Sequence, residues 1–67
     1  MIMLNGEVSE VDPGATVSDV LARLGLQPDE RGVAVAVDGA VVPRTDWGSF
    51  ALGADAHVEV LRAMQGG

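Results

Sequence analysis

The stretch Val33-Ala34-Val35-Ala36-Val37-Asp38-Gly39-Ala40-Val41-Val42-Pro43 decides the fold of this 67-residue chain. Valine alternates with alanine over residues 33–37, which is typical of a strand buried on one face and closely covered on the other. Asp38-Gly39 is a strong signal for a two-residue hairpin turn, because both turn positions need a positive φ. Residues 40–42 return along the sheet until Pro43, which has no N–H to donate, ends the strand. The stretch therefore predicts a hairpin whose first strand is the central strand of a sheet.

A second hairpin is predicted at the start of the chain. A short apolar strand leads into Asn5-Gly6, another two-residue turn signal, and residues 7–11 form the return strand. Two registers are open. A strict two-residue turn pairs Leu4 with Glu7, whereas a bulged turn pairs Leu4 with Val8 and buries apolar side chains more cleanly. The bulged register is favoured for that reason.

One helix is predicted, over about residues 17–24. Thr16 can act as its N-cap, with Asp19 three positions later in a relative of the capping box. Gly25-Leu26 is typical of a helix that ends in a left-handed glycine followed by a hydrophobic contact. The apolar stripe at helical spacing consists of Val17, Val20, Leu21 and Leu24. Val20 and Leu21 are expected to pack against Val35 of the sheet.

Residues 44–52 are predicted to be irregular, with Trp47 as the lid of a small core. A last strand follows over about His57 to Leu61. The predicted order is therefore β-β-α-β-β-β, an α+β roll with the helix across one face of the sheet. Residues 1–62 form one domain in this interpretation, and residues 63–67 form a flexible C-terminal tail.

The composition argues against several functions. The net charge is -6 and the only cations are four arginines, so binding to a nucleic-acid backbone is not expected. There is no cysteine, and the single histidine, His57, has no second histidine or cysteine with which to bind a metal, so it is interpreted as a solvated strand residue. The start of the chain lacks the basic region and apolar length of a signal peptide, and no run approaches a membrane span. A cytoplasmic protein that is not itself an enzyme is expected.

The sequence ends in Met64-Gln65-Gly66-Gly67. Two terminal glycines can be a frayed end, but the α-carboxylate of Gly67 is also the one reactive group that the composition leaves. Activation by ATP to an acyl-adenylate would give its carbon a leaving group, after which a thiol or persulfide could attack. Because glycine has no Cβ, Gly66 and Gly67 could enter a narrow site with Met64 and Gln65 behind them. Residues 63–67 would span roughly 17 Å when extended.

The chain resembles the ThiS-type sulfur carriers of thiamine biosynthesis. The resemblance rests on residues 33–44, Trp47 and residues 58–67, and its most distinctive part is Val42-Pro43-Arg44-x-x-Trp47. It implies a β-grasp, ubiquitin-like fold with a mixed sheet. It also implies that the Gly67 carboxylate is adenylated and converted to a thiocarboxylate, which donates sulfur for the thiazole ring of thiamine. The family commonly has an acidic residue before Gly-Asp ahead of the last strand; here residues 52–55 read Leu-Gly-Ala-Asp, so that turn is expected to differ.

The implied partners are an E1-like adenylyltransferase of the ThiF type, a thiazole synthase of the ThiG type and a sulfur donor such as a cysteine desulfurase. No bound cofactor is expected, and ATP is used by the partner enzyme. Two alternatives stay open at this point. One is a sulfur carrier for molybdopterin or another thiolated metabolite, and the other is a non-catalytic interaction module whose tail is inert.

Overall fold

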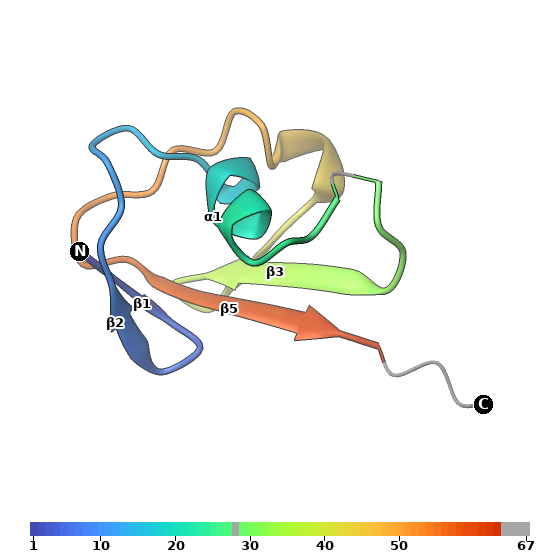
Figure 1. Cartoon of the computed structure of the whole chain (residues 1–67), viewed down its shortest axis with the longest axis horizontal. Coiled ribbons are helices and arrows are strands. Elements are labelled where there is room, and N and C mark those ends of the chain that lie inside the picture. Colours follow the sequence, from blue (N-terminus) through green and yellow to red (C-terminus); the bar gives the residue numbers. More distant parts are fainter. Residues whose placement is uncertain (28, 64–67) are drawn as a thin grey trace.

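A five-stranded sheet with one α-helix across it forms the body of the molecule (Figure 1). The computed structural model describes residues 1–27 and 29–63. Within these residues the element order is the predicted β-β-α-β-β-β, with a short 3-10 helix added between the fourth and fifth strands. The elements are β1 (Ile2–Leu4), β2 (Glu7–Ser9), α1 (Val17–Arg23), β3 (Val33–Val37), β4 (Ala40–Val42), η1 (Arg44–Asp46) and β5 (His57–Arg62).

The strands lie in the order β2-β1-β5-β3-β4, so the sheet is mixed. β5 pairs in parallel with β1 and antiparallel with β3, and it is the central strand. The prediction that residues 33–37 form the central strand was therefore wrong by one position. The prediction that both faces of this strand are covered was also wrong, because Ala34 is exposed and Ala36 is only half-buried. Their small side chains lie on a face that no other element of the described structure covers.

The first hairpin has the strict two-residue register, which corrects the preference for a bulge. Leu4 pairs with Glu7 and Met3 pairs with Val8. Asn5 and Gly6 both have positive φ angles, of 50° and 84°, as a primed turn requires. β2 is an edge strand, so Glu7 reaches solvent although it lies on the side of the sheet that carries the helix. The burial argument for the bulge therefore did not apply.

The helix ends are formed by the residues that the sequence indicates. The Thr16 hydroxyl accepts a hydrogen bond from the Asp19 N–H, and the Asp19 carboxylate accepts one from the Thr16 N–H, which completes a capping box. At the other end Gly25 has a φ of +78°. The Leu26 N–H donates to the Leu21 carbonyl, as expected when a helix ends in a left-handed glycine.

The core lies between α1 and one face of the sheet. Val17, Val20 and Leu21 of the helix are buried, and they pack in one cluster with Val35, as predicted. Leu24 differs from the prediction, because it caps the helix and remains 44% exposed. The buried residues of the cluster are Ile2, Val17, Val20, Leu21, Leu26, Val35, Val37, Val42, Trp47, Leu52, Ala56, Val58 and Val60. The arrangement is the α+β roll that the sequence predicts, and it is the β-grasp fold that the family resemblance implies.

Candidate functional site

The four predicted site residues, Met64, Gln65, Gly66 and Gly67, lie outside the described residues. What the structure describes is the place where the chain leaves the sheet just before them. β5 ends at Arg62, which pairs with Val33 at the end of the β3–β5 ladder, and Ala63 follows. We call Arg62 and Ala63 the tail root.

One further backbone hydrogen bond holds the tail root beyond the end of the ladder. The Ala63 N–H donates to the Gly32 carbonyl oxygen, with an N···O distance of 2.6 Å. Gly32 has a φ of +73°, and a Cβ placed on it would lie 3.3 Å from the Ala63 Cβ. A side chain at this position would be strained and would also press on the tail root, so glycine suits both the backbone conformation and the contact.

Glu30 joins the loop before β3 to the tail root. Its Oε2 accepts a hydrogen bond from Arg62 Nη2 at 3.0 Å, and this contact is also an ion pair. Its Oε1 accepts a bond from the Gln27 N–H at 3.3 Å. Its backbone carbonyl accepts a hydrogen bond from Arg44 Nη2. Three groups from separate parts of the chain therefore meet at one residue.

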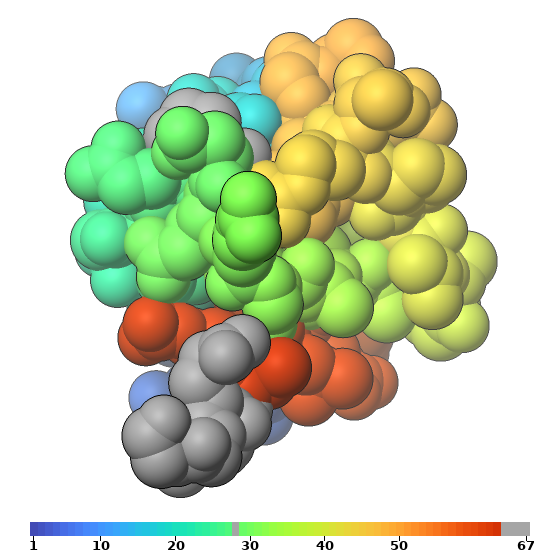
Figure 2. All heavy atoms as spheres, turned by 90° about the vertical axis from the view of Figure 1, so that its right-hand side faces the viewer, coloured from blue at the N-terminus to red at the C-terminus, as the bar shows by residue number. Residues whose placement is uncertain are grey.

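Arg44 and Trp47 connect this loop to the core. The Arg44 Cζ lies 4.4 Å from the centroid of the Trp47 ring, a cation–π arrangement. Trp47 is buried, as expected of a lid, and its Nε1–H donates to the Val42 carbonyl at 2.9 Å. Figure 2 shows this end of the molecule, with the loop before β3 (green) lying directly against the last residues of β5 (red) and beside the residues that follow β4 (yellow).

The face of the sheet away from α1 presents several apolar side chains to solvent. Val8 is 64% exposed, Val41 is 74% exposed and Leu61 is 62% exposed. We call this surface the open face; the strand pairings and alternation place on it Met3, Val8, Ala34, Ala36, Val41, His57, Glu59 and Leu61. Leu61 is only two residues from Ala63, so the open face extends to the tail root.

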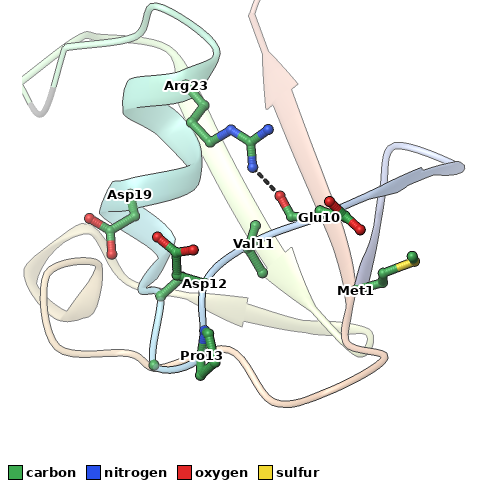
Figure 3. A pocket seen from close by; sticks show the side chains of 9 residues that line it. Met1, Glu10, Val11, Asp12, Pro13, Asp19 and Arg23 are labelled. Atoms are coloured by element: carbon green, nitrogen blue, oxygen red, sulfur yellow. Dashed lines mark hydrogen bonds between the residues drawn. The ribbon is translucent and has the colours of Figure 1, made fainter.

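A shallow groove lies on the opposite side of the molecule, between residues 10–15 and α1 (Figure 3). Arg23 reaches from the helix and donates a hydrogen bond to the Glu10 carbonyl across it. Asp12 and Asp19 lie along its rim without an ion pair among the described residues. This mixture of charges around an open groove contains no nucleophile with an adjacent base.

The described part of the chain also contains no group of three His, Asp or Glu side chains that could share a metal ion. His57 is exposed, as predicted, and its backbone N–H donates to Asp38 Oδ1 at 2.9 Å. None of the helices within residues 1–27 and 29–63 is long and apolar enough to span a membrane. Among the described residues, the tail root is held by both the Glu30 side chain and the Gly32 backbone.

Sequence reasoning missed Glu30 and Gly32. Arg44 and Trp47 were noticed as a motif, but their connection to the tail root was not predicted. Contacts between residues 30 and 62 depend on how β5 lies beside β3, and nothing local to Glu30 indicates them.

Comparison with known proteins gives a consistent result. The family model described as the ThiS family matches residues 2–67. A thiazole synthase of Magnetococcus marinus is 38% identical over 66 residues, which is 98% of this chain. The match covers 20% of that relative, so this chain spans only about a fifth of its length.

Two solved structures from Geobacter metallireducens have the same fold. The crystal structure of a thiamine biosynthesis protein (ThiS) has a TM-score of 0.78 and 28% identity, covering 98% of this chain and 97% of that one. The solution structure of a thiamine biosynthesis protein has a TM-score of 0.77 and 29% identity, covering 98% and 86% of the two chains.

Proposed function

The chain belongs to the ThiS family, the sulfur carriers of thiamine biosynthesis, and we propose that it carries sulfur as a thiocarboxylate on Gly67. The observation that supports this proposal most directly is that the family match extends through residue 67 and so includes Gly66 and Gly67. A second support is the tail root, because β5 ends at Arg62, immediately before Ala63 and these residues. The protein is a carrier on which other enzymes act.

The chemistry begins with the α-carboxylate of Gly67. One carboxylate oxygen attacks the α-phosphorus of ATP in the site of an E1-like adenylyltransferase of the ThiF type, and pyrophosphate leaves. The terminal sulfur of a donor persulfide, such as that on a cysteine desulfurase, then attacks the carbonyl carbon, and AMP leaves to give an acyl disulfide. A second thiol attacks the donor's sulfur, forms a disulfide with it and releases the thiocarboxylate. The carbon now holds sulfur in place of one oxygen. In this scheme the carrier itself needs no bound cofactor, and ATP is a substrate of the partner enzyme.

The proposed acceptor is a thiazole synthase of the ThiG type. The Magnetococcus marinus relative that carries this name contains a segment similar to nearly the whole of this chain. A carrier-like segment within such a protein supports a direct physical interaction between carrier and synthase. We place this exchange in the cytoplasm, where ATP is available to the activating enzyme.

Intact-mass spectrometry of the protein, isolated from cells that contain its partners, tests the proposal. We expect a fraction of molecules with the mass gain of one sulfur replacing one oxygen, located on the fragment that contains Gly67. A variant without Gly66 and Gly67 should show no such fraction. If the sulfur-containing form never appears, even with an E1-like enzyme and a sulfur donor supplied, the carrier function is wrong and an interaction module with an inert tail becomes the better explanation. Transfer of the sulfur to molybdopterin synthesis instead would contradict the thiamine assignment alone.

A further inference from the structure

We propose that Glu30 and Gly32 are positioning residues, which set the place and direction in which the tail leaves the sheet and thereby control the adenylation of Gly67. This inference rests on the proposed function, because it concerns the same carboxylate. The loop of residues 29–32, which we call the bracing loop, lies directly before β3 and against the end of β5. Its residues contact the tail root through both backbone and side chain.

The backbone contact comes from Gly32. The bond from the Ala63 N–H to the Gly32 carbonyl extends the antiparallel ladder one residue beyond the Val33–Arg62 pair. The position of Ala63 therefore depends on the left-handed turn that Gly32 makes, with a φ of +73°. The 3.3 Å distance from a Cβ at Gly32 to the Ala63 Cβ shows how little space the bracing loop leaves beside the tail root.

The side-chain contact comes from Glu30. Its carboxylate binds Arg62, while its carbonyl accepts a bond from Arg44, which stacks on the buried Trp47. This series of contacts gives the Pro43-Arg44-x-x-Trp47 motif a role: it anchors the bracing loop to the core. Because the Arg62 side chain is 65% exposed, its ion pair contributes little to the stability of the whole fold. Its main effect is local, on the tail root.

The position of the tail root matters because only a few residues separate it from the reacting carbon. Residues 64–67 can span at most about 14 Å when fully extended. So short a span cannot compensate for a tail root that starts in the wrong place once the body is docked on the enzyme. In a reaction that depends on in-line geometry, a misplacement of about 1 Å can lower the rate roughly a hundredfold.

The first test replaces Glu30 by alanine, with Glu7→Ala as the matched control. Glu7 is an exposed carboxylate on the edge strand β2 and has no ion pair among the described residues. Pyrophosphate release with an E1-like enzyme and ATP is measured as kcat and KM, alongside the thermal midpoint. We expect Glu30→Ala to lower kcat roughly tenfold or more, with KM and the thermal midpoint nearly unchanged. Glu7→Ala should leave all three values close to those of the parent.

The second test isolates the steric contact with the tail root. Gly32→Ala introduces both backbone strain and a methyl group against Ala63, whereas the double variant Gly32→Ala/Ala63→Gly has the same strain without that contact. We expect the single variant to lower kcat and the double variant to recover most of it, while their thermal midpoints stay similar. Ala63→Gly alone measures the effect of a more flexible tail root. Hydrogen exchange of the Ala63 amide reports the same contact without any enzyme. We expect slow exchange in the parent, faster exchange in Gly32→Ala and slow exchange again in the double variant.

The outcomes separate this inference from the function on which it rests. If the parent protein releases no pyrophosphate, the carrier function fails and the inference fails with it. If the parent is active and Glu30→Ala and Gly32→Ala have the kcat of the parent, the inference alone is overturned. The inference would also be overturned if kcat fell in proportion to the thermal midpoint, or if adding Ala63→Gly to Gly32→Ala did not restore kcat. Either result would show general destabilisation. A rise in KM with unchanged kcat would place these residues in docking and not in positioning.

Discussion

The side chain of Asn5 hydrogen-bonds to Val60 of β5, just beyond the end of β1. The Asn5 Oδ1 accepts a hydrogen bond from the Val60 N–H at 2.8 Å, and the Asn5 backbone N–H donates to the Val58 carbonyl at 2.9 Å. β1 ends at Leu4, one residue earlier, so these bonds continue the parallel pairing of β1 with β5 into the first turn. Asn5 thus joins residues at opposite ends of the chain.

Asn5→Ala should reduce the free energy of unfolding by about 1 to 3 kcal/mol. The substitution leaves the Val60 N–H without its acceptor and puts an alanine at a φ of 50°, where asparagine is better tolerated. Urea unfolding measures the change. Asn5→Asp keeps an acceptor oxygen and tolerates the same φ, so it should lose less. Equal losses for the two variants would show that the bond to Val60 contributes nothing.

Leu21→Ala should reduce the free energy of unfolding by about 2 to 5 kcal/mol, the usual range for a large-to-small change in a core. Leu21 is only 2% exposed and packs between α1 and the sheet. In a domain this small such a loss could unfold a substantial fraction of the molecules. Leu24→Ala, at a position that is 44% exposed, is the matched control and should have a clearly smaller effect. A loss below about 0.5 kcal/mol at Leu21 would contradict the packing, since changes of that size are typical of surface sites.

Gly67→Val should leave the fold and the docking of the body intact while slowing adenylation by orders of magnitude. Valine would crowd the carboxylate and displace it from in-line attack on the α-phosphorus, where about 1 Å can change the rate roughly a hundredfold. Among the residues that the structure describes, those of the hydrophobic core lie between Ile2 and Val60. Pyrophosphate release is measured beside a binding assay on the same variant. Release as fast as in the parent would show that the enzyme does not select glycine for its lack of a side chain.

Leu61→Glu should weaken docking of the body on the enzyme that accepts the tail, with KM rising roughly tenfold if Leu61 is among the few contacts that dominate such an interface. Leu61 is exposed on the open face only two residues before Ala63, so a partner that takes up the tail must come close to it. Val8→Glu places the same change on β2, at the far edge of the sheet, and should have a smaller effect. Equal effects of the two variants would show that the partner does not discriminate between these positions on the open face.

The local features of this fold could be predicted because their physical demands are local. Asn5-Gly6 and Asp38-Gly39 adopt positive φ angles, and the residues around Thr16 and Gly25 begin and end the helix as the sequence indicates. The register of the first hairpin could not be predicted from burial alone. Whether Glu7 reaches solvent depends on β2 being an edge strand, which is a property of the whole sheet.

The site was predicted only in part for the same reason. The two glycines at the end of the tail are visible in the sequence. That Gly67 carries sulfur stays a prediction, and so does the division into residues 1–62 and 63–67. The contacts of Glu30 with Arg62 and of Gly32 with Ala63 join residues about thirty positions apart. They exist because β3 and β5 are antiparallel neighbours, and no residue near Glu30 signals that pairing.

The central place of β5 also determines the order in which the sheet can assemble. The β1–β2 and β3–β4 hairpins are local structures, but they share no edge until β5 lies between them. Such closure by a late, non-local strand is a slow step in folding compared with hairpin formation. During synthesis the two hairpins therefore cannot join into one sheet until β5, the strand that directly precedes the tail, has been made. The sheet is therefore completed and the tail root placed at its end in the same step, so a partly folded chain would not hold Arg62 and Ala63 in the geometry described here.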